Sequence, residues 1–348
     1  MISFGVFIGA LVSNPVLLVI TVLIIGTIFV NGATDASNAI ATAIGTRSIN
    51  PDAAIAMGAI CNFIGLIVMT YLSTAVADTI SKMVNFGGDG HSALMALAAA
   101  MVSIIVWGAI AWKFGIPTSQ SHSLIAGLTG AAIAVQGGLA GINFGEWVKV
   151  IYGLLVSTVL GFGMGWGISK LIPIVCARVR RPTANRVFGP LNVAAGAFLA
   201  FMHGAQDGQK FMSIAMLGIV LSVGMDGAYG DYPFWIMVFC AACMALGSAM
   251  GGKKIIKSVA MDMVHLEKYQ GFAASLAAGL CLLFASLTGI PVSTTHTKTT
   301  AIMGVGAAKR LRAVKWDMAG SMVLTWVCTF PGCGLIGWAL AMLFVRIF

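Results

Sequence analysis

Long apolar runs fill most of the chain, and short polar links separate them. A helix needs about 20 apolar residues to cross a bilayer, and ten runs approach or exceed that length. They span residues 17–48, 53–72, 94–112, 115–135, 147–173, 190–225, 233–251, 269–289, 292–307 and 318–346. This pattern predicts an all-α membrane protein, a polytopic bundle with about 10–12 transmembrane elements if interrupted helices count twice.

Two of these runs carry an aspartate near the middle. The first contains Gly32-Ala-Thr-Asp35, and the second contains Gly204-Ala-Gln-Asp207. A carboxylate at membrane depth is costly and normally faces a cavity or a partner, so each is a candidate functional residue. The run 17–48 would be about 48 Å long as one helix, well beyond a hydrocarbon core of about 30 Å. We therefore expect both helices to be broken at the motif, where glycine loosens the helix and free backbone groups can bind an ion.

A second pair of motifs combines proline, hydroxyl residues and histidine. One reads Pro117-Thr-Ser-Gln-Ser-His122 and the other Pro291-Val-Ser-Thr-Thr-His296. Proline at a first helical position and free backbone amides mark a helix start, which together with hydroxyl donors suits a multi-oxygen anion. The hydroxyl donors are Ser119, Ser121, Ser293, Thr294 and Thr295. The two histidines are equally consistent with proton carriers, anion donors or packing residues.

The two kinds of motif recur at nearly one spacing. Asp207 follows Asp35 by 172 positions, and His296 follows His122 by 174. This spacing predicts two structural repeats joined by a basic cytoplasmic linker. The expected boundaries are 1–173 for the first repeat, 174–189 for the linker and 190–348 for the second repeat.

The charges on equivalent loops predict the relative orientation of the repeats. Segment 73–93 carries one Lys and two Asp, whereas its counterpart 252–268 is strongly basic. Because basic loops stay in the cytoplasm, equivalent loops should lie on opposite faces of the membrane. Inverted repeats with interrupted helices are the architecture of secondary transporters.

Composition supports a membrane protein and argues against a nucleic-acid partner. Hydrophobic residues make up 59% of the chain and charged residues 9%, against about 25% charged in soluble domains. The net charge of +9 comes from Lys and Arg gathered in three links, 170–186, 253–268 and 309–315. Such clustering is typical of cytoplasmic loops beside anionic lipid. We predict a multi-pass protein of the cell membrane that contacts membrane lipid and no nucleic acid; a homo-oligomer is left open.

The four motifs together resemble the inorganic phosphate transporter (PiT) family, over nearly the whole chain. The resemblance implies cation-coupled import of inorganic phosphate by a carrier without a cofactor, coupled to a proton or sodium. By motif position, Asp35, Asn38 and Asp207 would be cation and coupling residues and candidate sodium ligands. The implied phosphate-binding residues are Ser119, Gln120, Ser121, His122, Ser293, Thr294, Thr295 and His296.

Three departures from the family pattern bear on the cation and coupling sites. Thr34 and Gln206 stand where the family has Asn before each Asp, and Lys210 replaces the later Asn of the second motif. Lysine is a donor-only cation and cannot ligate sodium, but at a three-residue helical spacing it can pair with Asp207. We therefore predict that Lys210 belongs to the coupling site in place of a sodium ion. Proton coupling, as in the bacterial branch, is favoured over sodium coupling.

Two other functions compete with phosphate symport. A sulfate permease of the same family would bind an anion of the same shape. An intramembrane hydrolase would need one oriented nucleophile–base pair, whereas the polar clusters here are duplicated, so we do not expect an enzyme. Lys298, two residues past His296, is either a substrate contact or a side chain that reaches toward the membrane interface.

Overall fold

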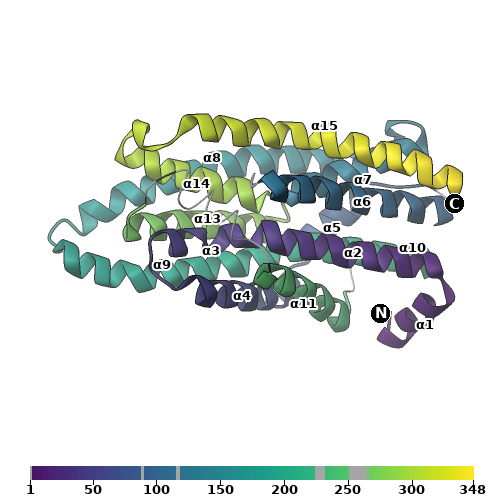
Figure 1. Ribbon diagram of the computed structural model, residues 1–348, viewed down its shortest axis with the longest axis horizontal. Helices are drawn as coiled ribbons and strands as arrows, with labels where there is room; N and C mark the ends of the chain where they lie inside the picture. Colours follow the sequence, from purple (N-terminus) through teal and green to yellow (C-terminus); the bar gives the residue numbers. More distant parts are fainter. Residues whose placement is uncertain (1, 88–89, 115–117, 224–231, 251–263, 265) are drawn as a thin grey trace.

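The computed structural model describes residues 2–87, 90–114, 118–223, 232–250, 264 and 266–348, with the side chains of residues 36, 37 and 318 left out. Its helices lie along the long axis of one elongated bundle (Figure 1). The first eight are α1 Phe4–Ser13, α2 Pro15–Thr34, α3 Ala36–Gly45, α4 Pro51–Leu72, α5 Ala75–Lys82, α6 Gly90–Phe114, α7 Gln120–Gln136 and α8 Phe144–Val175. The remainder are α9 Arg181–His203, a π-helical turn Gly204–Gly208, α10 Gln209–Val223, α11 Phe234–Met250, α13 Lys268–Thr288, α14 Thr294–Lys309 and α15 Trp316–Ile347.

The predicted all-α membrane fold is confirmed. Each of the ten apolar runs contains helix among its described residues. In the described part of the chain, seven helical stretches are long and apolar enough to cross a membrane. The joined stretches Pro15–Gly45 and Arg181–Val223 each count once among these seven. Of the other predicted spans, α7, α11 and α14 have 17, 17 and 16 residues, so they are shorter than a typical span.

Two segments that we expected to be loops contain helix. The polar segment after residue 72 includes α5, which buries Val76, Ala77 and Ile80 on one face. This amphipathic helix has eight residues, too few to register as an apolar run. The predicted linker 174–189 is also largely helical, because α9 already begins at Arg181 with a proline in its first turn. Proline is well tolerated at that position.

Glycines set two equivalent helix crossings. At the crossing of α2 with α11, a Cβ on Gly32 would collide with the backbone carbonyl oxygen of Met244. At the crossing of α4 with α9 and the π-helical turn, a Cβ on Gly204 would collide with that of Asn62. Both glycines belong to the Gly-Ala-x-Asp motifs. Their role in the structure is therefore close backbone packing rather than loosening of the helix.

The short helices α7 and α14 start side by side and extend toward opposite ends of the bundle (Figure 1). The Ser293 hydroxyl donates a hydrogen bond to Ser119 Oγ at 2.8 Å, which joins the two N-caps. Helix α15 packs along α7, and α8 packs along α14. Each short helix thus packs along a long helix from the other half of the chain, as two copies of one repeat would. The repeat boundaries and the inversion remain predictions, since residues 226–231 and 252–263 lie outside the described residues.

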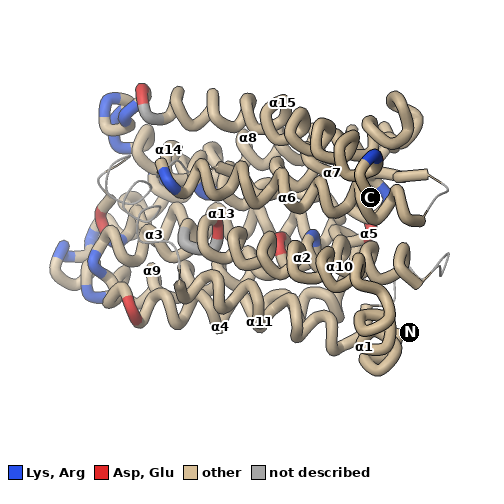
Figure 2. The backbone as a smooth tube through the Cα atoms, turned by 45° about the vertical axis from the view of Figure 1, so that its right-hand side comes forward, with Lys and Arg blue, Asp and Glu red and all other residues tan. Residues whose placement is uncertain are grey.

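Basic residues gather at one end of the bundle (Figure 2). This is the end where α9 begins and α14 ends, and it carries Arg181, Arg186 and Lys309. By the positive-inside rule, we expect this end to lie in the cytoplasm.

Candidate functional site

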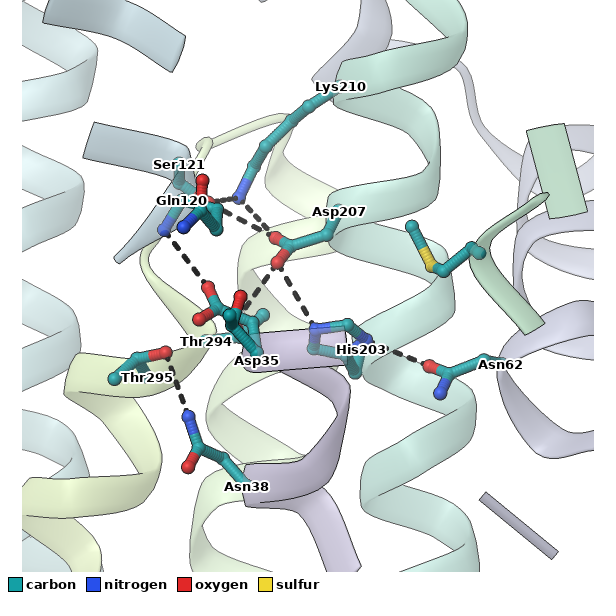
Figure 3. Close-up of polar contacts among 12 residues, drawn as sticks. Asp35, Asn38, Asn62, Gln120, Ser121, His203, Asp207, Lys210, Thr294 and Thr295 are labelled. Carbon is teal, nitrogen blue, oxygen red and sulfur yellow. Dashed lines mark hydrogen bonds and ion pairs between the residues drawn. The ribbon is translucent and has the colours of Figure 1, made fainter. Parts of the chain in front are cut away.

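The four sequence motifs meet in the interior of the bundle (Figure 3). Asp35 lies between α2 and α3, and Asp207 lies in the π-helical turn. The start of α7 contacts both carboxylates, and the start of α14 contacts that of Asp207. All twelve predicted site residues are buried: Asp35, Asn38, Ser119, Gln120, Ser121, His122, Asp207, Lys210, Ser293, Thr294, Thr295 and His296. The structure thus brings together residues that are up to 261 positions apart in sequence.

Neither motif helix is opened as widely as we expected. At Asp35 the backbone keeps right-handed helical angles, with φ −83° and ψ −38°. Its carbonyl accepts a hydrogen bond from the Asn38 amide at 3.0 Å, a tighter three-residue turn. The second motif instead widens into the five-residue π-helical turn around Asp207. Such turns inside α-helices often mark functional sites. The interruption is therefore local in both helices, and each continues beyond it.

Lys210 occupies a cage of oxygen atoms beside Asp207. Its ammonium lies 2.8 Å from Asp207 Oδ1, 2.8 Å from Ser121 Oγ and 2.6 Å from the carbonyl oxygen of Val292. Its side chain is fully buried, as is that of Asp207. A buried charge requires a close partner and further hydrogen bonds, and both are present here.

Further donors surround the Asp207 carboxylate. The Ser121 and Thr294 hydroxyls donate to it at 3.2 and 3.1 Å, one from the start of α7 and one from the start of α14. His203 Nε2 lies 3.2 Å from Oδ2, and its Nδ1 lies 2.8 Å from Asn62 Oδ1 (Figure 3). The sequence predicted a role for neither His203 nor Asn62. The one available signal for Asn62 was a polar side chain inside the apolar run 53–72.

The Asp35 carboxylate has a different environment. It accepts a hydrogen bond at 3.1 Å from the backbone amide of Gln120, at the start of α7. Among the described residues, no Lys, Arg or His nitrogen lies within ion-pair distance of it. Nearby in the chain, Asn38 donates to Thr295 Oγ1 at 3.1 Å.

Several buried amide groups around Asp35 lack partners. Within the described chain, this holds for both polar side-chain atoms of Asn31 and of Gln120, and for Asn38 Oδ1. Buried polar groups are normally hydrogen-bonded, so such a cluster calls for an explanation. Carboxylate and amide oxygens are suitable ligands for a hard cation. The set around Asp35 therefore fits a small cation. Asp35 and Asn38, three residues apart, are two of the oxygen ligands that it offers.

The two predicted histidines pack against each other where α7 and α14 begin. Their ring centroids are 4.3 Å apart in an edge-on arrangement. His296 stacks on Trp326 at 3.6 Å, and His122 lies 4.8 Å from the ring of Phe330. Neither ring makes a side-chain hydrogen bond to a serine within the described residues.

Lys298 does not reach the membrane interface, so that alternative is wrong. Its side chain is 1% exposed, and its ammonium contacts Thr42 Oγ1 at 3.1 Å and Ser275 Oγ at 2.9 Å.

Interrupted helices whose buried charges meet inside a membrane bundle are typical of transporters. Comparison with known families is more specific: the model of the phosphate transporter family matches residues 31–337, and the chain belongs to this family. It is a multi-pass protein of the cell membrane.

Relatives align over nearly the full chain. A probable low-affinity inorganic phosphate transporter of Bacillus subtilis (strain 168) is 33% identical, over 92% of this chain and 96% of its own length. A protein of the same name from Rhizobium meliloti (strain 1021) is 35% identical, over 88% and 90%. A solved structure described as the sodium-dependent phosphate transporter superposes with a TM-score of 0.85 and covers 96% of this chain and 100% of its own. At 22% identity, that likeness supports the fold alone.

Proposed function

We propose that this protein imports inorganic phosphate by symport with a cation, and that the cation is a proton in preference to sodium. Family membership and the names of the two bacterial relatives support phosphate as the solute. The observation that carries the proposal is the convergence of two carboxylates and two helix starts on one buried point.

The helix starts supply the chemistry for a tetrahedral oxyanion. Free backbone amides and the positive end of the helix dipole favour negative charge at a helix N-terminus. Here α7 and α14 start side by side, joined by Ser119 and Ser293. The hydroxyls of Ser121 and Thr294 already donate to the carboxylate of Asp207. The same donors suit the oxygens of phosphate.

Carboxylates beside the anion favour phosphate over sulfate. A phosphate that carries a proton can donate a hydrogen bond to Asp35 or Asp207, whereas sulfate has no proton to donate at neutral pH. The sulfate permease remains the alternative within the family, and competition between the two anions separates them.

The cage around Lys210 supports proton coupling. A carboxylate, a hydroxyl and a carbonyl oxygen are the ligand types that a sodium ion would use. In this protein a fixed ammonium already occupies them at 2.6–2.8 Å. At Asp207 a sodium ion would gain little by entering beside that charge, and the coupling cation is then left to the set of residues around Asp35. The proton then travels on phosphate, on Asp35 or on a histidine.

Uptake of radiolabelled phosphate by proteoliposomes tests the proposal. An inward pH gradient, acidic outside, should drive accumulation without sodium, and unlabelled phosphate should compete where a tenfold excess of sulfate does not. Competition by sulfate equal to that of phosphate would favour the sulfate permease. Absence of phosphate uptake under either a proton or a sodium gradient would refute phosphate symport.

A further inference from the structure

A row of polar side chains runs from the central site toward the basic end of the bundle. We call Asn38, Thr42, Thr46, Asn192, Ser275 and Lys298 the polar row. Asn38 and Thr42 of α3 and Thr46, which caps its C-terminus, are spaced four residues apart and so lie on one face. All six side chains are buried, at 9% exposure or less.

Hydrogen bonds connect the polar row across three other helices. Asn38 contacts Thr295 on α14 at 3.1 Å, and the hydroxyls of Thr42 and Ser275 lie 2.7 Å apart. Further along, Asn192 on α9 donates to Thr46 Oγ1 at 2.8 Å and to Ser48 Oγ at 3.4 Å.

Lys298 places a positive charge in the middle of the polar row. Its ammonium contacts the hydroxyls of Thr42 and Ser275. No described carboxylate lies within ion-pair distance of it. This differs from Lys210, which pairs with Asp207. An ammonium buried without an anion is costly, so residues of this kind commonly mark an ion or substrate pathway.

The polar row ends at a basic hollow. Ser48, which accepts from Asn192, lines an open hollow of about 530 Å³ together with Arg186, Lys268 and the neighbouring face of α9. Behind it, Asn192 Oδ1 is buried and has no partner among the described residues. The positive charges of Arg186 and Lys268 at the mouth of the hollow favour an anion.

The other half of the chain has apolar residues at the equivalent positions, so the fold itself does not require the polar side chains of the polar row. Offsets of 172 or 174 positions relate Thr42 to Ile214, Ser275 to Met101, Lys298 to Leu124 and Asn192 to Ile20. These four apolar residues are buried in a single hydrophobic cluster. Apolar side chains therefore fill the core at the same places in the other half, and packing alone does not call for polar ones.

We propose that Lys298, with Thr42 and Ser275, forms a second anion-binding station between the central site and the basic hollow, and that phosphate leaves through it. This inference rests on the proposed function and names a further site for the same anion. The hydroxyls replace water around the anion, and the ammonium compensates its charge. Because several modest sites in series bind the ion without trapping it, the polar row permits release.

Transport by Lys298→Met and Lys298→Arg tests the station. Lys298→Met should lower the maximal rate of phosphate uptake at least tenfold, with the half-saturating phosphate concentration changed less than threefold. Lys298→Arg keeps the charge and should retain most of the rate. Lys309→Met, which removes an exposed lysine paired with Glu267 at the end of the same helix, is the matched control and should transport normally. If Lys298→Met takes up phosphate at the same rate as the unmodified protein, the second anion-binding station is refuted. If the unmodified protein takes up no phosphate, the proposed function is refuted as well.

Cysteine accessibility tests the station without changing Lys298. On a cysteine-free background, an anionic thiosulfonate reagent applied from the side of Arg186 and Lys268 should modify Thr42→Cys, and phosphate should slow the reaction. Ile214→Cys, its equivalent in the other half, should react at least tenfold more slowly. Equal reactivity of the two cysteines, or no effect of phosphate, contradicts a route through the polar row. Equal loss of transport and of thermal stability in both Lys298 variants would indicate a purely structural lysine.

Discussion

The two Gly-Ala-x-Asp motifs share one packing geometry and differ in the surroundings of their carboxylates. Gly32 and Gly204 bring their helices equally close to a neighbouring backbone. Asp207 nevertheless contacts Lys210 and His203, whereas Asp35 contacts an amide at the start of α7 and no described cation. Backbone packing thus preserves the equivalence, while two exchanges make the halves chemically distinct: Lys210 stands in place of Asn38, and His203 in place of Asn31.

The largest predicted effect separates the two carboxylates. Asp207→Asn leaves the buried ammonium of Lys210 without its partner, which should cost about 3–5 kcal/mol of folding free energy. Asp35→Asn removes a buried charge that has no described cationic partner, so its stability should be unchanged or higher. Phosphate uptake should be lost in both. Thermal unfolding in detergent and uptake into proteoliposomes measure the two effects.

Two outcomes would contradict this prediction. Equal destabilisation by the two substitutions would show that Lys210 does not distinguish the halves. Near-normal uptake by either variant would remove that aspartate from the transport mechanism.

The glycine crossings should respond alike, because there the halves are equivalent. Gly32→Ala and Gly204→Ala each place a methyl group against a carbonyl oxygen, and such overpacking costs about 1–3 kcal/mol. Gly163→Ala on α8 is the matched control, since a Cβ there meets nothing within 4 Å. Thermal unfolding should show similar losses for the first two and none for the control. An unaffected Gly32→Ala or Gly204→Ala would refute the packing role of that glycine.

A smaller effect is expected from the hydroxyls at the helix starts. Ser121→Ala removes a donor aimed at Asp207, and loss of one buried donor costs about 1–3 kcal/mol, or roughly a tenfold weaker phosphate affinity. Ser123→Ala on the same helix is the control, because that hydroxyl bonds back to the carbonyl of Ser119. Equilibrium binding of labelled phosphate measures the difference. Equal phosphate affinities in the two variants would show that the hydroxyl of Ser121 does not bind phosphate.

The sequence predicted the parts of the fold that depend on periodic hydrophobicity and repeated motifs. The ten apolar runs, the pairing of Lys210 with Asp207 and the assembly of four motifs all follow from residue type and spacing. Helix α5 was missed because eight amphipathic residues give no apolar run. The unlike turns at Asp35 and Asp207 were missed because backbone hydrogen bonding there is decided by tertiary packing.

Two other features depend on contacts that no linear pattern encodes. Asn62 meets His203 from another helix, 141 positions away. Lys298 is turned inward by hydroxyls on α3 and α13, while its sequence context equally allowed an outward direction.

The most direct test is the sodium dependence of phosphate uptake by the wild type and by Lys210→Asn, measured under the same pH gradient. If the ammonium of Lys210 stands in place of a sodium ion, replacing external sodium with choline should leave the wild-type rate unchanged. Lys210→Asn restores an amide oxygen, and its uptake should become sodium-stimulated. Strong dependence of wild-type uptake on sodium would contradict the account, as would a folded, fully active Lys210→Asn protein that remains indifferent to sodium.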